Sequence, residues 1–420
     1  MRPPPLRLCY PRQPKRGNAM RLLQSVLSRL KQTKKPQYKF VTHLLGLLLM
    51  LPGHATFRNM SRYSPYHEKT FSPWYDSPFD WVSLNQAAIT EVVPAEHEQA
   101  MVMDASFVPK SGEHTYGLGR FWNGSHSRAE KGLEISTLAW LEITGHCAYA
   151  LSVEQTPPSA ETSDPEATRM DVYLDQLSRV VKAHDLKFLR YVVTDGAYSK
   201  QKFVAGVRAL ELHQIGKLRA DAHLRYLYQG PKRPGPGRHK VYDGKVNWLD
   251  LSRFERLETI DEPIVLYHQV LNHVQLKRNL QVVVVVHTQR QRYAVLFSTD
   301  VDLEPLILYR YYKARFQVEF LFRDAKQFTG LSDGQARSKA KLDFHLGASL
   351  SAVTFAKLET RHQNGHGDQA FSMASLKRRA FNQHLVDRIC EHLANGQSLE
   401  KSSPAYEALC NYGIIDNKAA

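Results

Sequence analysis

Two aspartates stand in sequence contexts that favour metal-ion chemistry. Asp104 and Asp195 each end a short apolar run that predicts a strand, and each is followed by small residues. Two carboxylates at neighbouring strand ends would repel one another unless a cation lay between them. Oxygen ligands without a nearby Cys or His favour magnesium or manganese. A strand-end aspartate often only opens a turn, so neither residue is decisive alone.

A third acid, Glu319, lies in a predicted helix over residues 306–328. At about 100° per residue, five polar side chains of this helix fall within an arc of roughly 80°. Aromatic and apolar residues flank the arc, which favours a polar cleft over solvent; a surface helix with many salt bridges is the alternative. One acid among cations suits a metal ligand surrounded by phosphate-binding groups. The arc contains Tyr312, Arg315, Glu319, Arg323 and Lys326.

The same helix carries a specific resemblance. Tyr312-x2-Arg315-x3-Glu319-x6-Lys326 matches the YREK signature of the insertion-sequence 4 family of bacterial DDE transposases. The blocks VMDASFVPKSG around Asp104 and YVVTDGAYS around Asp195 resemble the two aspartate blocks of that family. The likeness covers roughly residues 100–350.

The resemblance implies a role for each matching residue. Asp104, Asp195 and Glu319 would be the catalytic ligands of two Mg²⁺ (or Mn²⁺) ions, which can serve both ends of an in-line displacement at phosphorus. Tyr312, Arg315 and Lys326 would contact DNA phosphates at the transposon end. Arg323 lies outside the signature and is proposed as a DNA contact from its helix position only.

The resemblance also implies partners. The substrates would be double-stranded DNA, both the terminal inverted repeats and the target. The chain would form a homodimer in the synaptic complex. It would be a cytoplasmic, nucleoid-associated protein of a bacterium. A base flipped onto an aromatic side chain makes Trp122 and Trp248 candidate stacking residues, although packing in the core is the favoured interpretation for both.

The elements expected around these residues are those of an α/β, ribonuclease H-like mixed-sheet catalytic core. Three antiparallel strands, a helix, a strand, a helix and a strand follow one another in the order βββαβαβ. Their predicted ranges are 100–106, 133–140, 147–154, 170–184, 188–193, 200–215 and 218–228. A further helix is expected over 339–359.

The rest of the chain suggests flanking regions. We expect a basic flexible tail over 1–36, a helical DNA-binding region over 37–95, the core over 96–229 and 301–360, a β-rich insertion over 230–300 and a helical region over 361–420. Helices predicted at 38–51, 56–62 and 67–75 fit either a helix-turn-helix or a plain helical cap. Pro73 should end or distort the last of them.

Charge favours a polyanionic partner. The formal net charge is +15, and residues 1–67 carry 13 Lys and Arg and no acid. The cysteines Cys9, Cys147, Cys390 and Cys410 are widely spaced, which argues against a zinc site and fits a reducing cytosol. The longest apolar run, residues 44–51, is too short to span a bilayer and is expected to be a buried helix face.

Two other functions remain open at this point. A catalytically dead DNA-binding regulator would suit the charge but does not explain three acids in order. A ribonuclease H-like nuclease not involved in transposition would share the acids but would not need the YREK residues.

Overall fold

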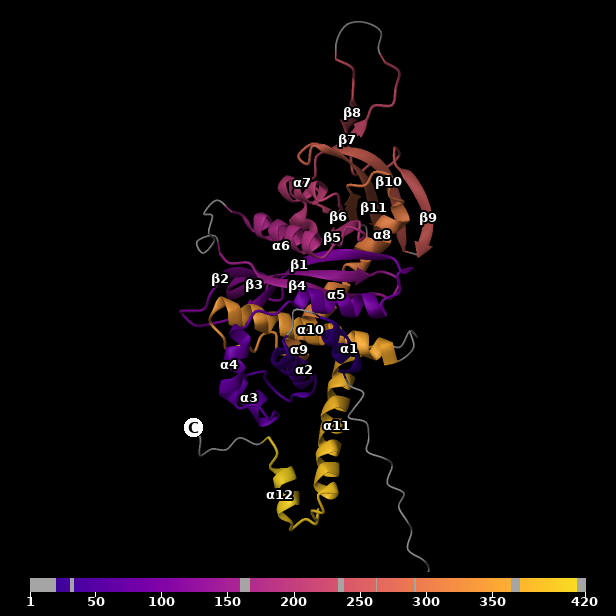
Figure 1. Ribbon diagram of the computed structural model, residues 1–420. Coiled ribbons are helices and arrows are strands. Elements are labelled where there is room, and N and C mark those ends of the chain that lie inside the picture. The colour runs from indigo at the N-terminus through magenta and orange to yellow at the C-terminus, as the bar shows by residue number, and fades with distance from the viewer. Residues whose placement is uncertain are drawn as a thin grey trace, which may run out of the picture.

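The computed structural model describes residues 20–30, 34–158, 167–232, 238–261, 263–290, 292–363 and 371–413. Within these residues the strands form one 12-stranded mixed sheet. Helices cover both faces of its central part: α6 and α7 lie on one side of β1, and α5 and α10 lie on the other (Figure 1). The predicted mixed α/β fold is therefore confirmed.

Five strands follow the predicted ribonuclease H-like order. The long strand β1 (Gln99–Pro109) is antiparallel to β3 and parallel to β5, and β6 is parallel to β5 on its far side. The helices α6 (Arg169–Ala183) and α7 (Gln201–Ala209) make the two crossovers. Across the sheet the order is β4 (Cys147–Gln155), β3 (Arg128–Glu142), β1, β5 (Tyr191–Thr194) and β6 (His213–Leu218).

Alternation along β1 gives each face of the sheet its own core. Met101 and Met103 pack in one apolar cluster with Leu177 of α6. Ala100 and Val102 pack in another cluster with Val318. Val318 belongs to a C-terminal helix, more than 100 residues after α7. Asp104 continues the second series, so its side chain lies on the face that the C-terminal helices cover.

The strands of the predicted insertion extend this same sheet. Strand β12 pairs antiparallel with β6, and β11, β10 and β7 follow outward. The five-valine run forms the centre of β11, as its β-branched residues predict. The bounds are β7 (Leu224–Leu227), β8 (Tyr242–Lys245), β9 (Glu255–Asp261), β10 (Ile264–His273), β11 (Arg278–His287) and β12 (Arg292–Ser298). Part of the Gly- and Pro-rich break at 230–237 lies outside the described residues.

The helix expected over 306–328 is two helices, which corrects the prediction. Helix α8 (Pro305–Ala314) and helix α9 (Gln317–Phe328) meet at Arg315 and Phe316. Both junction residues keep right-handed helical angles, but the backbone bonds there span three residues, as from Glu319 N to Phe316 O at 3.1 Å. Tighter turns rotate the side chains of α9 relative to α8, so one helical wheel does not describe both.

Two other predicted boundaries are wrong. The helix expected over 200–215 ends at Ala209 because Glu211 adopts a left-handed backbone angle (φ 64°), and the chain then enters β6. The strand expected over 218–228 is divided between β6 and β7 by a turn. Strand β2 (Gly119–Asn123), which pairs with the start of β3, was not expected.

The N-terminal region consists of helices packed under the sheet. Helix α1 (Arg21–Arg29) buries Leu22, Leu23, Val26 and Leu27, so the expected flexible tail does not hold for these residues; residues 1–19 lie outside the described part. Helix α4 continues past Pro73 because Phe71 and Tyr75 are buried on either side of it, and packing of two aromatic rings offsets the lost backbone bond. The remaining bounds are α2 (Lys35–Met50), α3 (Phe57–Arg62), α4 (Glu68–Asp76) and α5 (Trp81–Val92).

The C-terminal helices complete the fold. Helix α10 (Lys339–Gln363) is buried along most of its length under the sheet, whereas α11 (Met373–Ala394) extends away from the body and α12 (Pro404–Cys410) lies beside it (Figure 1). Residues 44–51 are largely buried, as predicted. Among the described helices, none combines the length and apolarity needed to cross a membrane.

Candidate functional site

The parallel pairing of β1 and β5 brings the two aspartates to equivalent positions. The ladder joins Met101 to Val192 and ends with Met103 opposite Thr194. Asp104 and Asp195 are each the next residue after that last pair, so two unrelated apolar runs place carboxylates at the same level on neighbouring strands. Asp195 also accepts a hydrogen bond from the backbone N of Ala197 at 2.9 Å and caps the short 3-10 turn Gly196–Tyr198.

The Asp104 carboxyl is held in an unfavourable environment for its charge. Its side chain is only 15% exposed, and burial raises its pKa to about 7. Arg315 opposes that shift, while the negative charges of Asp195 and Glu319 add to it. Charge effects on a pKa require proximity, so both other acids lie near enough to act on Asp104. A carboxylate in this position is stabilised by an added cation.

Arg315 supplies positive charge between two of the acids. Its guanidinium donates to Oδ2 of Asp104 at 3.2 Å and to Oε1 of Glu319 at 2.8 Å. Its side chain is 16% exposed, so the charge pairs are poorly screened by water. The helix junction at Arg315 places this residue at the C-terminus of α8, directly before the helix that carries Glu319.

Asp104 and Glu319 are paired with this guanidinium and do not form a ready-made ion position. In the described parts of the chain, no three Asp, Glu, His or Cys side chains approach closely enough to hold one metal ion. The set nonetheless has the chemistry that a divalent ion needs: oxygen donors, one of them buried and destabilised by its like-charged neighbours. Asp104, Asp195 and Glu319 are therefore the residues that could hold it, after Arg315 releases the carboxylates.

Two more of the predicted residues lie in this site. Lys326 donates to the hydroxyl of Ser106 at 2.9 Å, and burial lowers the pKa of its ammonium. The Tyr312 ring lies 6.0 Å from the Arg315 guanidinium, and burial raises the pKa of its hydroxyl. The sequence did not predict Ser106 as a site residue. Its position two residues after Asp104 could have indicated it, because alternate residues of a strand lie on the same face.

Arg323 is not brought among the acids of the site. It forms an ion pair with its neighbour Asp324 at 2.9 Å, and its guanidinium lies 4.7 Å from the centroid of the Phe320 ring. Arg323 shares α9 with Glu319 and Lys326, but its guanidinium is held by Asp324 and lies near the Phe320 ring instead of the acids.

The two tryptophans differ in environment. Trp122 is 61% exposed on β2, so the core-packing interpretation is wrong for it. Trp248 is half-buried and stacks near Phe254 and Tyr293, with ring centroids 6.3 Å apart in both pairs. Trp248 therefore fits the packing interpretation.

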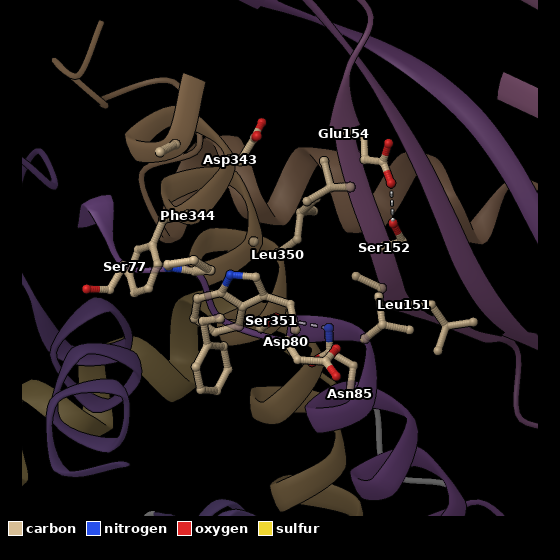
Figure 2. Close-up of a pocket in the computed structure, with 18 of the residues that line it drawn as sticks. Ser77, Asp80, Asn85, Leu151, Ser152, Glu154, Asp343, Phe344, Leu350 and Ser351 are labelled. Atoms are coloured by element: carbon tan, nitrogen blue, oxygen red, sulfur yellow. Dashed lines mark hydrogen bonds between the residues drawn. The ribbon is translucent and has the colours of Figure 1, made fainter. Parts of the chain in front are cut away.

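A cavity lies elsewhere in the described part of the chain. It has a volume of about 710 Å³ and is bounded by α5, β4 and α10 (Figure 2). Glu154 accepts from Ser152 and Asn85 donates to Ser351 across its wall, and Asp80 and Asp343 add further acids to its rim. None of the three predicted catalytic acids lines it, and at its rim Arg179 pairs with Glu154 and Lys339 pairs with Asp343.

Comparison with protein-family models gives one match. Residues 24–264 fit the model described as DDE superfamily endonuclease, which is more than half of the chain. The matched segment contains Asp104 and Asp195 and ends before Glu319. No curated protein matches the chain.

Proposed function

The chain belongs to the DDE superfamily endonuclease family, and from this premise we propose that it is a transposase, which cuts DNA at the ends of an insertion sequence and joins them to target DNA. The finer assignment, to the insertion-sequence 4 family, is supported by the YREK spacing of Tyr312, Arg315, Glu319 and Lys326. The observation that carries the proposal is Arg315, which connects a strand acid to a helix acid in one cluster.

The cluster contains both kinds of group that phosphodiester chemistry requires. Carboxylates are needed to hold cations, and fixed positive groups are needed to neutralise the phosphate. Asp104, Asp195 and Glu319 supply the first kind, and Arg315 and Lys326 the second. Divalent magnesium, when bound to the acids, would supply Lewis-acid activation of water and stabilisation of the leaving oxygen.

The chain's own cations position the DNA. Arg315 offers a planar fork suited to two phosphate oxygens, once its bonds to the acids are exchanged for bonds to the backbone of DNA. Lys326 is tied to Ser106 on β1, so its charge is fixed close to Asp104. Burial raises the pKa of the Tyr312 hydroxyl, which can donate to a phosphate oxygen.

The two aspartates orient the reacting centre from a rigid base. Asp104 lies within β1 and Asp195 directly follows β5, and the strand residues Val102, Met103, Val192 and Val193 beside them are fully buried. Rigid placement matters because a small displacement of a reacting atom costs a large factor in rate. Glu319 comes from a separate helix, so the site closes only when α9 packs on the sheet.

Products of a single reaction distinguish transposition from the other functions. Purified protein is incubated with Mg²⁺, a linear DNA that ends in the inverted repeats flanking the gene, and a supercoiled plasmid. Joined donor–plasmid products support the transposase. Cleavage without joining would indicate a nuclease of the same family, and binding without cleavage would indicate a DNA-binding regulator.

The two ends of an element must be held together, so a homodimer is proposed for the synaptic complex. Sizing chromatography coupled to light scattering, with and without end DNA, measures it. A complex with one chain per two DNA ends would contradict the dimer while leaving the catalytic assignment intact.

A further inference from the structure

We propose that the hairpin made by β2 and the start of β3 is a second DNA-contacting surface, which holds duplex DNA to one side of the cleavage point. The surface consists of Arg120, Trp122, Ala129 and Lys131, here called the hairpin platform. The inference rests on the proposed function, because it assumes that DNA occupies the Asp104 site. It adds a contact that the matching signature residues do not include.

The strand register places these four side chains together. Arg120 pairs with Lys131, and Trp122 pairs with Ala129. Partners in an antiparallel ladder point to the same face, so two cations lie directly opposite one another beside an indole. Like charges in such a pair are destabilising, and an anion bound between them would relieve the repulsion. The small Ala129 leaves the indole uncovered, in agreement with its 61% exposure.

The opposite face of the hairpin is different. Phe121 is buried there, with the Arg169 guanidinium 5.3 Å from its ring. Glu130 also lies on that face, where hydrogen bonds from Asn123, His126 and Arg128 lower its pKa to about 2. The carboxylate of the hairpin is thus paired on the inner face. The four-residue outer platform carries two positive charges and no acid.

The platform shares a face with the catalytic residues. Asp104 pairs with Thr137 of β3, so the two side chains point the same way. Lys131 and Ala129 precede Thr137 by six and eight residues, and even spacing keeps a strand side chain on one face. Between them, Leu133 and Ile135 pack in the same apolar cluster as Val318 of α9. Asp104 and the platform therefore lie on the same face of the sheet, at the two ends of a stretch that buried Leu133 and Ile135 occupy.

The separation along β3 fits two contacts on one duplex. Six to eight residues at about 3.3 Å each put the platform roughly 20–26 Å from Asp104. That length corresponds to about 6–8 base pairs at 3.4 Å per pair. Cations are spaced along the same line, with Arg315 at Asp104, Lys326 at Ser106 and the Arg120–Lys131 pair at the hairpin.

Charge and shape together favour DNA as the occupant. A phosphate between Arg120 and Lys131 would be contacted from two sides, while the indole of Trp122 offers an apolar face to a sugar or base edge. An acidic protein could also pair with Arg120 and Lys131. Only DNA, however, would contact both the platform and the Asp104 site on the same sheet face.

The test compares two variants on two lengths of DNA. Trp122→Ala and the double variant Arg120→Ala/Lys131→Ala are assayed with end DNA carrying either about 4 or about 20 base pairs on the platform side of the cut. On the long DNA we expect roughly tenfold weaker binding for Trp122→Ala. The double variant should lower the salt dependence of binding by about two charges. On the short DNA both variants should equal the unaltered chain.

Matched controls use residues away from this face. Phe188 is a similarly exposed aromatic, 60% accessible, beside Trp140, and Lys182 is an exposed cation in the last turn of α6. Phe188→Ala and Lys182→Ala should bind both DNAs normally. Equal melting temperatures for all variants would show that the hairpin still folds.

Two failures are distinguishable. If the unaltered chain binds neither DNA, both this inference and the proposed function are overturned. If it binds and cuts normally, and the platform variants match it on the long DNA, only the platform is overturned.

Discussion

The guanidinium of Arg315 donates to the carboxylate of Asp104 across 211 residues of sequence, at 3.2 Å, and no other cation is as close to that acid among the described ion pairs. The same guanidinium also holds Glu319. Divalent ions and Arg315 would therefore compete for the same oxygens. If the acids hold a metal as proposed, its binding and the release of Arg315 toward a phosphate would be parts of one exchange.

Arg315→Ala should destabilise the metal-free protein. The variant leaves Asp104 and Glu319 without their shared cation, and removing one partner of a buried ion pair costs about 3 kcal/mol or more in the free energy of unfolding. Denaturation in EDTA measures that loss. Adding Mg²⁺ should raise the melting temperature of the variant more than that of the unaltered chain.

Arg315→Lys is the matched control for charge. A lysine keeps the positive charge but cannot bridge two carboxylates with a fork, so partial recovery of stability is expected. Identical responses of the alanine variant and the unaltered chain to Mg²⁺ would contradict the exchange.

Removal of any one acid should abolish cleavage. Asp104→Ala, Asp195→Ala and Glu319→Ala each remove an oxygen donor from the cluster, and a loss of roughly a thousandfold or more in the cleavage rate is expected. Gel-shift binding to end DNA should persist. Asp175→Ala, an exposed acid of α6, serves as the control and should cut normally. Full cleavage by any one of the three would remove that residue from the site.

Lys326→Ala should change how DNA binding depends on salt. Its ammonium is fixed to Ser106 beside Asp104, where a phosphate must lie during cleavage. Loss of one phosphate contact lowers the slope of log affinity against log salt by about one. Lys326→Arg should keep the slope. An unaltered slope in the alanine variant would argue against a phosphate role.

His273 should make the folded protein sensitive to mild acid. Burial lowers its pKa to about 4, below the 6.5 expected when the chain is unfolded. The unfolded state therefore binds a proton at pH values where the folded state does not, so stability falls as the pH drops from 6.5 toward 4. At pH 5 the loss is about 2 kcal/mol.

Urea unfolding at pH 7 and pH 5 measures that loss. His273→Asn can still accept the backbone hydrogen bond from Leu276 but cannot take up the proton. It should lose less stability between the two pH values than the unaltered chain. Equal losses would mean that other groups cause the acid sensitivity.

Local patterns in the sequence determined the central elements of this protein. Apolar runs before Asp104 and Asp195 predict β1 and β5, helical spacing predicts α6, and the valines at 282–286 predict β11, because period and β-branching act within a few residues. The succession of strands and helices was sufficient to predict the mixed α/β fold. The catalytic roles of the three acids remain predictions.

Tertiary packing decided what local patterns could not. The junction at Arg315 interrupts a sequence with continuous helical character, and buried rings on either side carry α4 past Pro73. Exposure of Trp122 depends on the small Ala129 across the ladder, which no local pattern around the tryptophan specifies. The contact of Arg315 with Asp104 depends on how helices pack on the sheet, since residues so distant in sequence meet only when the whole core is formed.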